Sequence, residues 1–170
     1  MEKELIAGCL KKDRRIQKAL YDKYKDAMFS IAYRMMCDFD LAHDVLQEAF
    51  IQIFRDIAKF KGESTLGAWI KTIVIRSALN ELKKIKPIRT LDEEHDDIPV
   101  EWDENLTGEM LEKAIRQLPD GYRAVFVMIE VEGYSHKEVA EMLKISEGTS
   151  KSQLFHAKKM LQKRIKLITS

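Results

Sequence analysis

Residues 135–161 read SHKEVAEMLKISEGTSKSQLFHAKKML and decide the fold of the C-terminal part of the chain. Ser135, followed three residues later by Glu138, fits a capping box at the start of a short helix. That helix carries a small residue, Ala140, where a second helix must cross closely, and it ends near Leu143. A tight turn with the apolar Ile145 follows, and then a longer helix begins with small polar residues. This order of features predicts a helix-turn-helix.

In DNA-binding versions of this motif, the first turns of the second helix enter the major groove. Gln can bond adenine bidentately, and Lys can reach guanine or phosphate. The residues expected near bases or phosphates are Glu147, Thr149, Ser150, Lys151, Gln153, Leu154, His156, Lys158 and Lys159. A plain helical hairpin is the alternative. Lys144 occupies the turn where Gly would relieve a left-handed backbone conformation, which costs Lys about 1 kcal/mol.

The residues before this motif predict two more helices of the same module. An amphipathic helix is formed by Leu106, Met110, Leu111, Ala114, Ile115 and Leu118, and Pro119 closes it. Asp120 is expected to cap the next helix, from about residue 121 to 132, with Gly133 at its C-terminal end. Ser146 is expected to cap the long final helix, from Glu147 to about residue 167.

The N-terminal half predicts three helices. Apolar residues recur at steps of three and four over residues 16–35, and a second such stripe covers residues 42–57, with Asp40 as its expected N-cap. Gly62 and Ser64 interrupt the chain, and a third helix runs from about residue 65 to 84. The fold class is therefore all-α, with two small helical domains over residues 1–85 and 105–170. An acidic flexible linker, residues 86–104, joins them.

Charge is distributed very unevenly along this chain of net charge +1. Residues 1–90 carry +6, residues 91–112 carry −10 and residues 113–170 carry +5. Two basic modules joined by an acidic connector are typical of a protein that binds a polyanion twice.

Composition excludes several classes of protein. The chain has no long uncharged apolar run and no secretion signal, so we expect no membrane insertion. Its two Cys are far apart in sequence, which favours a reduced, cytoplasmic protein over a disulfide framework. The four His are dispersed, and neither a Gly-rich phosphate loop nor a paired Cys-His spacing occurs. We therefore expect no catalytic residues, no metal site and no cofactor, so the chain is not expected to be an enzyme.

Residues 60–84, FKGESTLGAWIKTIVIRSALNELKK, combine aromatic residues, a short polar loop and cations. Upstream, residues 41–54 read LAHDVLQEAFIQIF and place Asp44, Gln47 and Glu48 on one exposed helix face, at i, i+3 and i+4. A solvated polar face is the alternative reading of those three residues.

These stretches together resemble a known family, the extracytoplasmic-function sigma factors. Residues 123–161, RAVFVMIEVEGYSHKEVAEMLKISEGTSKSQLFHAKKML, look like the C-terminal DNA-binding domain of that family. Residues 41–54 and 60–84 are similar to its N-terminal domain, and the resemblance covers nearly the whole chain in the right order. The chain departs from the family at three positions. Arg76 stands where many members have Asn, and Gln153 and His156 stand where many have Arg. The resemblance thus implies promoter binding, without implying which promoter.

The resemblance implies a role for each N-terminal segment. Asp44, Gln47 and Glu48 would dock on the clamp helices of the RNA polymerase β′ subunit. The segment from residue 60 would recognise and melt the minus-ten element by taking a base out of the stack, with cations on the phosphates. Trp69 shares a face with buried-type residues, which favours a packing role over a stacking platform. The minus-ten residues are Phe60, Lys61, Gly62, Glu63, Ser64, Thr65, Lys71, Arg76, Asn80, Lys83 and Lys84.

The resemblance also implies the remaining partners. The helix-turn-helix residues named above would recognise the minus-thirty-five element, and the β flap of polymerase would receive this domain. The acidic linker, by its position, would cross the active-site cleft of polymerase as a nucleic-acid mimic, or would only tether the domains. An anti-sigma factor is a further implied partner, and the free protein is expected to be a monomer.

Two functions compete on these grounds. The first is a dissociable sigma factor that directs transcription initiation together with core polymerase. The alternative is a self-sufficient helix-turn-helix regulator, commonly a dimer on a palindrome. Residues 40–84 favour the first function, because a repressor has no need of a docking helix beside a strand-opening loop.

Overall fold

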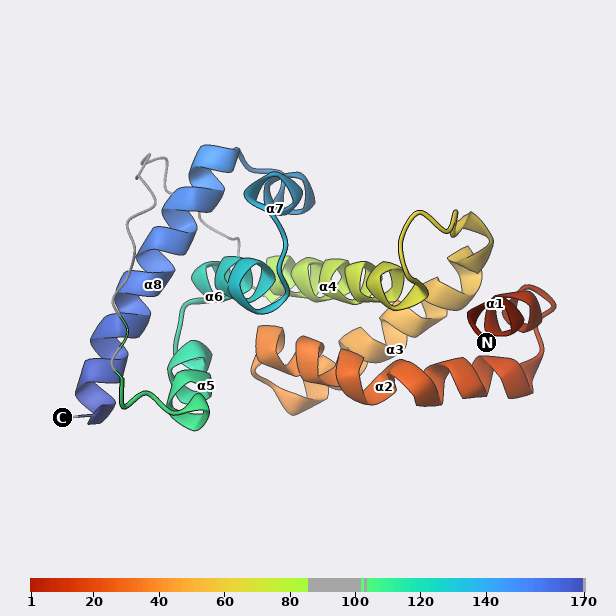
Figure 1. Cartoon of the computed structure of the whole chain (residues 1–170), viewed down its shortest axis with the longest axis horizontal. Helices are drawn as coiled ribbons and strands as arrows, with labels where there is room; N and C mark the ends of the chain where they lie inside the picture. Colours follow the sequence, from red (N-terminus) through yellow and green to blue (C-terminus); the bar gives the residue numbers. More distant parts are fainter. Residues whose placement is uncertain (86–101, 103, 170) are drawn as a thin grey trace. The chain divides into compact units, whose positions relative to one another are not determined.

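The computed structural model describes residues 1–85, 102 and 104–169, and every regular element within them is helical (Figure 1). The chain divides into two compact units, Met1–Lys84 and Ile85–Ser170. The predicted all-α class with two helical domains is confirmed. The predicted acidic connector falls mostly outside the described residues.

The first unit contains α1 (Glu2–Leu10), α2 (Arg14–Met36), α3 (Phe39–Asp56), the short 3-10 helix η1 (Ile57–Lys59) and α4 (Leu66–Ile85). Helices α2 and α3 pack along one another, and α1 packs on both α2 and η1. The core between the helices includes fully buried Leu20, Met35, Ile53 and Ile70. These residues belong to the apolar stripes that the periodicity predicted, so the stripes face inward as expected.

Side-chain caps begin α2, α3 and α4. Thr65 Oγ1 accepts from the Ala68 N–H at 3.2 Å at the start of α4. The predicted cap of α3, Asp40, is wrong, because Asp38 holds that position and accepts from the Leu41 N–H at 2.9 Å. Cys37 ends α2 in a left-handed conformation (φ 53°), and α3 is capped one residue later, two residues before the predicted position. Asp40 lies instead in the first turn of α3, where its charge still complements the helix dipole.

The second unit contains α5 (Gly108–Arg116), α6 (Asp120–Phe126), the π-helical segment η2 (Val127–Val131), α7 (His136–Leu143) and α8 (Glu147–Thr169). Helix α8 packs against α5, α6 and α7, and is therefore the central element of the unit. Buried Leu154, Ala157, Leu161 and Ile165 recur at steps of three and four and form its core stripe.

The chain between α5 and α7 differs from the prediction in two ways. The predicted single helix is divided, because Val127–Val131 form the π-helical segment η2. Asp120 is the first residue of α6 and not its cap, because Pro119 holds the N-cap position. The Asp120 carboxylate accepts from the Arg123 guanidinium at 2.5 Å. Arg123 is 3% exposed and also donates to the Leu118 carbonyl at 2.8 Å. This buried arginine thus joins the start of α6 to the residues that precede it.

Candidate nucleic-acid interface

The helix-turn-helix of the second unit has the local geometry that its sequence predicts. Glu138 N–H donates to Ser135 Oγ at 3.1 Å and Ser135 N–H donates to a Glu138 carboxylate oxygen at 2.8 Å, which completes the capping box. Lys144 takes the left-handed conformation (φ 56°, ψ 47°), and the following Ile145 N–H donates to the Ala140 carbonyl at 3.0 Å. The turn between α7 and α8 is therefore closed by backbone hydrogen bonds around a strained lysine.

Two hydroxyl groups hold the first turn of α8. Ser146 Oγ accepts from the Thr149 N–H at 3.0 Å, which confirms Ser146 as the cap. His136 Nδ1, in the first turn of α7, hydrogen-bonds Ser150 Oγ at 2.8 Å, and Ser150 is completely buried. This contact between the helices links the N-terminal end of α8 to α7, and no local sequence pattern indicated it.

The nine residues predicted for the minus-thirty-five element divide by exposure. Glu147, Lys151 and Lys159 are exposed, and Lys159 Nζ lies 4.5 Å from the centre of the Phe155 ring. His156 and Lys158 are half-buried. The other four are buried, namely Thr149, Ser150, Gln153 and Leu154. These side chains are enclosed by protein in this structure, whereas the exposed residues present polar atoms to a ligand.

Lys158 is engaged within the protein. Its ammonium lies 2.9 Å from the Glu130 carboxylate, and only 17% of the lysine side chain is exposed. Glu130 belongs to η2 and Lys158 to α8, so the ion pair ties these two elements together. A paired ammonium is already neutralised, and a phosphate would have to compete with Glu130 for it.

The polar loop before α4 presents an open surface in the first unit. Residues 61–65 are all exposed, and Gly62 adopts a left-handed conformation (φ 74°) that a side chain would strain. Behind the loop, the Phe60 and Trp69 rings meet with centroids 5.5 Å apart. Both rings are half-buried. The pair therefore braces the loop and keeps part of its aromatic surface accessible.

Helix α4 extends from this loop with one exposed polar stripe. Arg76, Asn80 and Lys83 are exposed and spaced by four and three residues, so they share a face. Lys84 is also exposed and lies 3.4 Å from the Glu81 carboxylate. Lys71, nearer the loop, is half-buried. The loop thus precedes α4, and the exposed cations Arg76 and Lys83 lie on one face of that helix.

The predicted docking face on α3 is accessible. Asp44, Gln47 and Glu48 are all exposed. Ile51 follows them on the same face and is 67% exposed. The sequence did carry a signal for Ile51, because it falls outside the apolar stripe of α3.

A bilayer-spanning helix is not found in the described part of the chain. In that same part, three or more His, Cys, Asp or Glu side chains do not gather into a possible metal site.

Comparisons with known proteins give a consistent result for both units. The family model of Sigma-70 region 2 matches residues 20–87, and that of Sigma-70, region 4 matches residues 108–161. The chain is 27% identical to the ECF RNA polymerase sigma factor SigW of Bacillus subtilis (strain 168), over 98% of this chain and 97% of that protein. It is 26% identical to the ECF RNA polymerase sigma-E factor of Escherichia coli (strain K12), over 95% and 92%.

Solved structures share the fold. The sigma factor RpoE, in complex with the anti-sigma factor NepR from Bartonella quintana, matches with a TM-score of 0.60 and 21% identity, over 88% of this chain and 96% of that chain. CnrH, in complex with the cytosolic domain of CnrY, matches with a TM-score of 0.56 and 17% identity, over 96% of each. Both regional matches occur in one chain and in the same order as the two units.

Proposed function

This chain belongs to the sigma-70 family as an extracytoplasmic-function sigma factor, and from that premise we propose how its surfaces direct transcription initiation. It binds core RNA polymerase, recognises a promoter through both units and dissociates as a specificity subunit without catalysis of its own. The single observation that carries this proposal is the occurrence of both sigma regions in one chain. A helix-turn-helix regulator would need only the second.

The exposed face of α3 is the proposed polymerase-docking surface. Asp44, Gln47 and Glu48 supply polar contacts to the β′ clamp helices, and Ile51 supplies the apolar contact. A large exposed side chain surrounded by polar residues is well suited to become a buried anchor when a partner covers it. The β flap is the proposed partner of the second unit.

The loop of residues 61–65 and the α4 stripe are the proposed minus-ten surface. The exposed loop takes up a base that has left the stack, and Phe60 and Trp69 support it from behind. Arg76, Asn80 and Lys83 follow the duplex on the upstream side of that base. Lys61, Lys71 and Lys84 contribute charge near the backbone. This arrangement lets binding energy offset the cost of unstacking.

The first turns of α8 are the proposed minus-thirty-five surface. Glu147 and Lys151 are exposed there and would reach base edges or phosphates, with Lys159 and His156 further along the helix. We propose a supporting role for Thr149, Ser150, Gln153 and Leu154, because their burial fixes the position of the exposed side chains. Lys158 contacts the minus-thirty-five DNA only if its ion pair with Glu130 breaks.

Control by an anti-sigma factor is part of the proposal. Among the proteins with this fold, RpoE is seen with the anti-sigma factor NepR, and CnrH is seen with the cytosolic domain of CnrY. A partner that covers the α3 face would block access to polymerase. The free chain would then act as a monomer that exchanges between the inhibitor and the core enzyme.

The Gln47→Ala/Glu48→Ala double variant tests the proposal. We expect affinity for core polymerase to fall about tenfold or more, since two contacts of an interface centre are removed, while the circular dichroism spectrum stays unchanged. Glu4→Ala, which removes one exposed carboxylate from α1, is the control and should bind normally. Unchanged affinity of the double variant would contradict the docking assignment. Tight duplex binding by the chain alone, with none to core polymerase, would favour the self-sufficient regulator.

A further inference from the structure

A second basic surface in the first unit is not used by the proposed minus-ten contacts. Residues 11–25 contain seven Lys or Arg and two Asp. Four of these cations, Lys11, Lys12, Arg14 and Arg15, are consecutive except for Asp13, and all four are exposed. Lys11 and Lys12 lie in the turn between α1 and α2, and Arg14 and Arg15 begin α2. We name these four residues the basic corner.

The basic corner is held rigidly. Asp13 N–H donates to the Gly8 carbonyl and Lys12 N–H to the Cys9 carbonyl, both at 3.0 Å. Gly8 lets α1 approach α2 closely, because a Cβ at that position would collide with the Ile16 side chain. Lys12 itself is left-handed (φ 57°). Because these hydrogen bonds fix the backbone, only the side chains have to be ordered when they meet a ligand.

The charges of the basic corner are not neutralised by neighbours. None of the four cations forms an ion pair with another described residue. The Asp13 carboxylate between them accepts from the Arg15 N–H at 2.9 Å as the cap of α2. The acids of α1, Glu2 and Glu4, lie in its first turn, at the other end of that helix. The corner therefore keeps a strong local positive potential.

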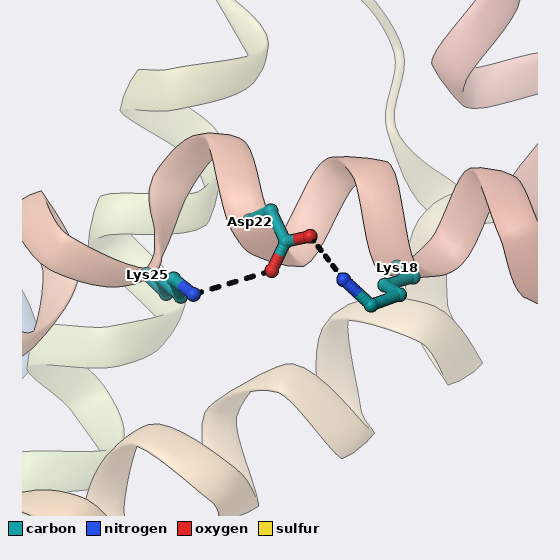
Figure 2. A network of polar contacts seen from close by, with 3 residues as sticks. All are labelled: Lys18, Asp22 and Lys25. Carbon is teal, nitrogen blue, oxygen red and sulfur yellow. Dashed lines mark hydrogen bonds and ion pairs between the residues drawn. The ribbon is translucent and has the colours of Figure 1, made fainter.

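Lysines further along α2 differ in this respect. Figure 2 shows the Asp22 carboxylate between Lys18 and Lys25, at 2.6 Å and 3.3 Å from their ammonium groups. Hydrogen bonds from Lys18 and Lys25 lower the pKa of Asp22, so the carboxylate stays charged and offsets one of the two lysine charges. This trio offers a matched comparison on the same helix.

The position of the basic corner relates it to the minus-ten loop. Helix α1 packs against η1, and η1 leads directly into the loop of residues 61–65. Figure 1 shows α1 and the start of α2 at the same end of the first unit as this loop, while α4 runs from the loop toward the opposite end. A strand that follows the α4 stripe to the loop and continues past it would next meet the basic corner.

We infer that the basic corner binds the phosphates of the melted non-template strand beyond the base-capturing loop. The inference rests on the proposed function of that loop and extends it downstream. Single strands are held by cations that follow the backbone together with base-stacking surfaces. The corner supplies cations alone, so the contact is independent of sequence and sensitive to salt.

The test uses holoenzyme and two forked promoter fragments. In one, the non-template strand ends just after the minus-ten element; in the other, it continues for about ten nucleotides, within the site size of single-strand-binding surfaces. Wild-type holoenzyme should bind the longer fork more tightly. The Arg14→Ala/Arg15→Ala variant should show a gain about tenfold smaller. The salt dependence of its binding to the longer fork should be shallower by about 0.7 in slope for each lost phosphate contact.

Lys18→Ala/Lys25→Ala is the control, since it removes the same number of cations from α2. It should retain the gain from the longer strand, and a loss equal to that of the arginine variant would overturn the inference. A wild-type gain of zero, with the short fork still bound in preference to duplex, would overturn it as well and would leave the minus-ten proposal standing. If wild type binds neither fork better than duplex, both proposals fail.

Discussion

Helices α4 and α8 both carry proposed DNA contacts, but they expose them differently. On α4, Arg76, Asn80 and Lys83 follow the helical period and form one exposed stripe. On α8, the predicted residues run almost continuously from 147 to 159 and thus surround the helix. A helix packed on three neighbours cannot expose its whole circumference, so part of the second set is buried. Resemblance to a motif therefore locates a surface well only where its residues also share a face.

The largest expected difference between the two helices concerns stability. Leu154→Ala should lower the free energy of unfolding of the second unit by about 3 kcal/mol, because it leaves a cavity at a position only 2% exposed. Asn80→Ala on α4 removes an exposed side chain and should change stability by less than about 0.5 kcal/mol. Urea denaturation of the full chain, followed by circular dichroism, measures both.

Equal stability of the two variants would break the comparison. It would mean that Leu154 does not pack in the core stripe of α8, and it would return this residue to the DNA-contact set. Loss of promoter binding by Leu154→Ala without loss of stability would point the same way.

What the sequence predicted correctly consists mostly of local signals. The capping box of Ser135 and Glu138, the cap at Ser146 and the left-handed turn at Lys144 each depend on residues within one helical turn. The apolar stripes were also predicted, because a period of 3.6 residues identifies a buried face regardless of its partner. The two helical units follow from these elements together with the change of charge between them.

The features that were missed depend on residues distant in sequence. His136 and Ser150 meet across the helix-turn-helix, and Lys158 meets Glu130 from another element. Neither contact follows from the periodicity of one segment. Asp38, and not Asp40, caps α3, because α3 begins directly after the left-handed residue Cys37. The DNA and polymerase contacts remain predictions, since they need partners that a single chain does not contain.

The turn before α8 provides a smaller test of how its first residues are positioned. Lys144→Gly should raise the free energy of unfolding by about 0.5 kcal/mol, because relief of left-handed strain exceeds the entropy cost of Gly. Lys144→Ala keeps the Cβ and the strain and should give no such gain. The two variants are distinguished by their urea denaturation midpoints, provided that the dependence of the unfolding free energy on urea concentration is the same for both. A gain for Ala equal to that for Gly would show that the charge, and not the backbone, determines the effect.

The smallest expected effects distinguish free from paired cations on α8. Lys151→Ala should reduce the salt slope of holoenzyme binding to minus-thirty-five DNA by up to about one unit, if its exposed ammonium meets a phosphate. Lys158→Ala should change the slope less, because Glu130 already neutralises that lysine at 2.9 Å.

Glu130→Gln completes this test by removing the competing charge while preserving the shape of the side chain. If Lys158 can reach a phosphate once released, the slope should increase by a fraction of one unit, and Lys158→Ala added to Glu130→Gln should cancel the increase. If the slope is unchanged by Glu130→Gln, Lys158 only joins α8 to η2. In that case the minus-thirty-five surface of α8 would consist of exposed residues alone, as the surface of α4 does. The two helices would then differ only in how many of their faces are buried.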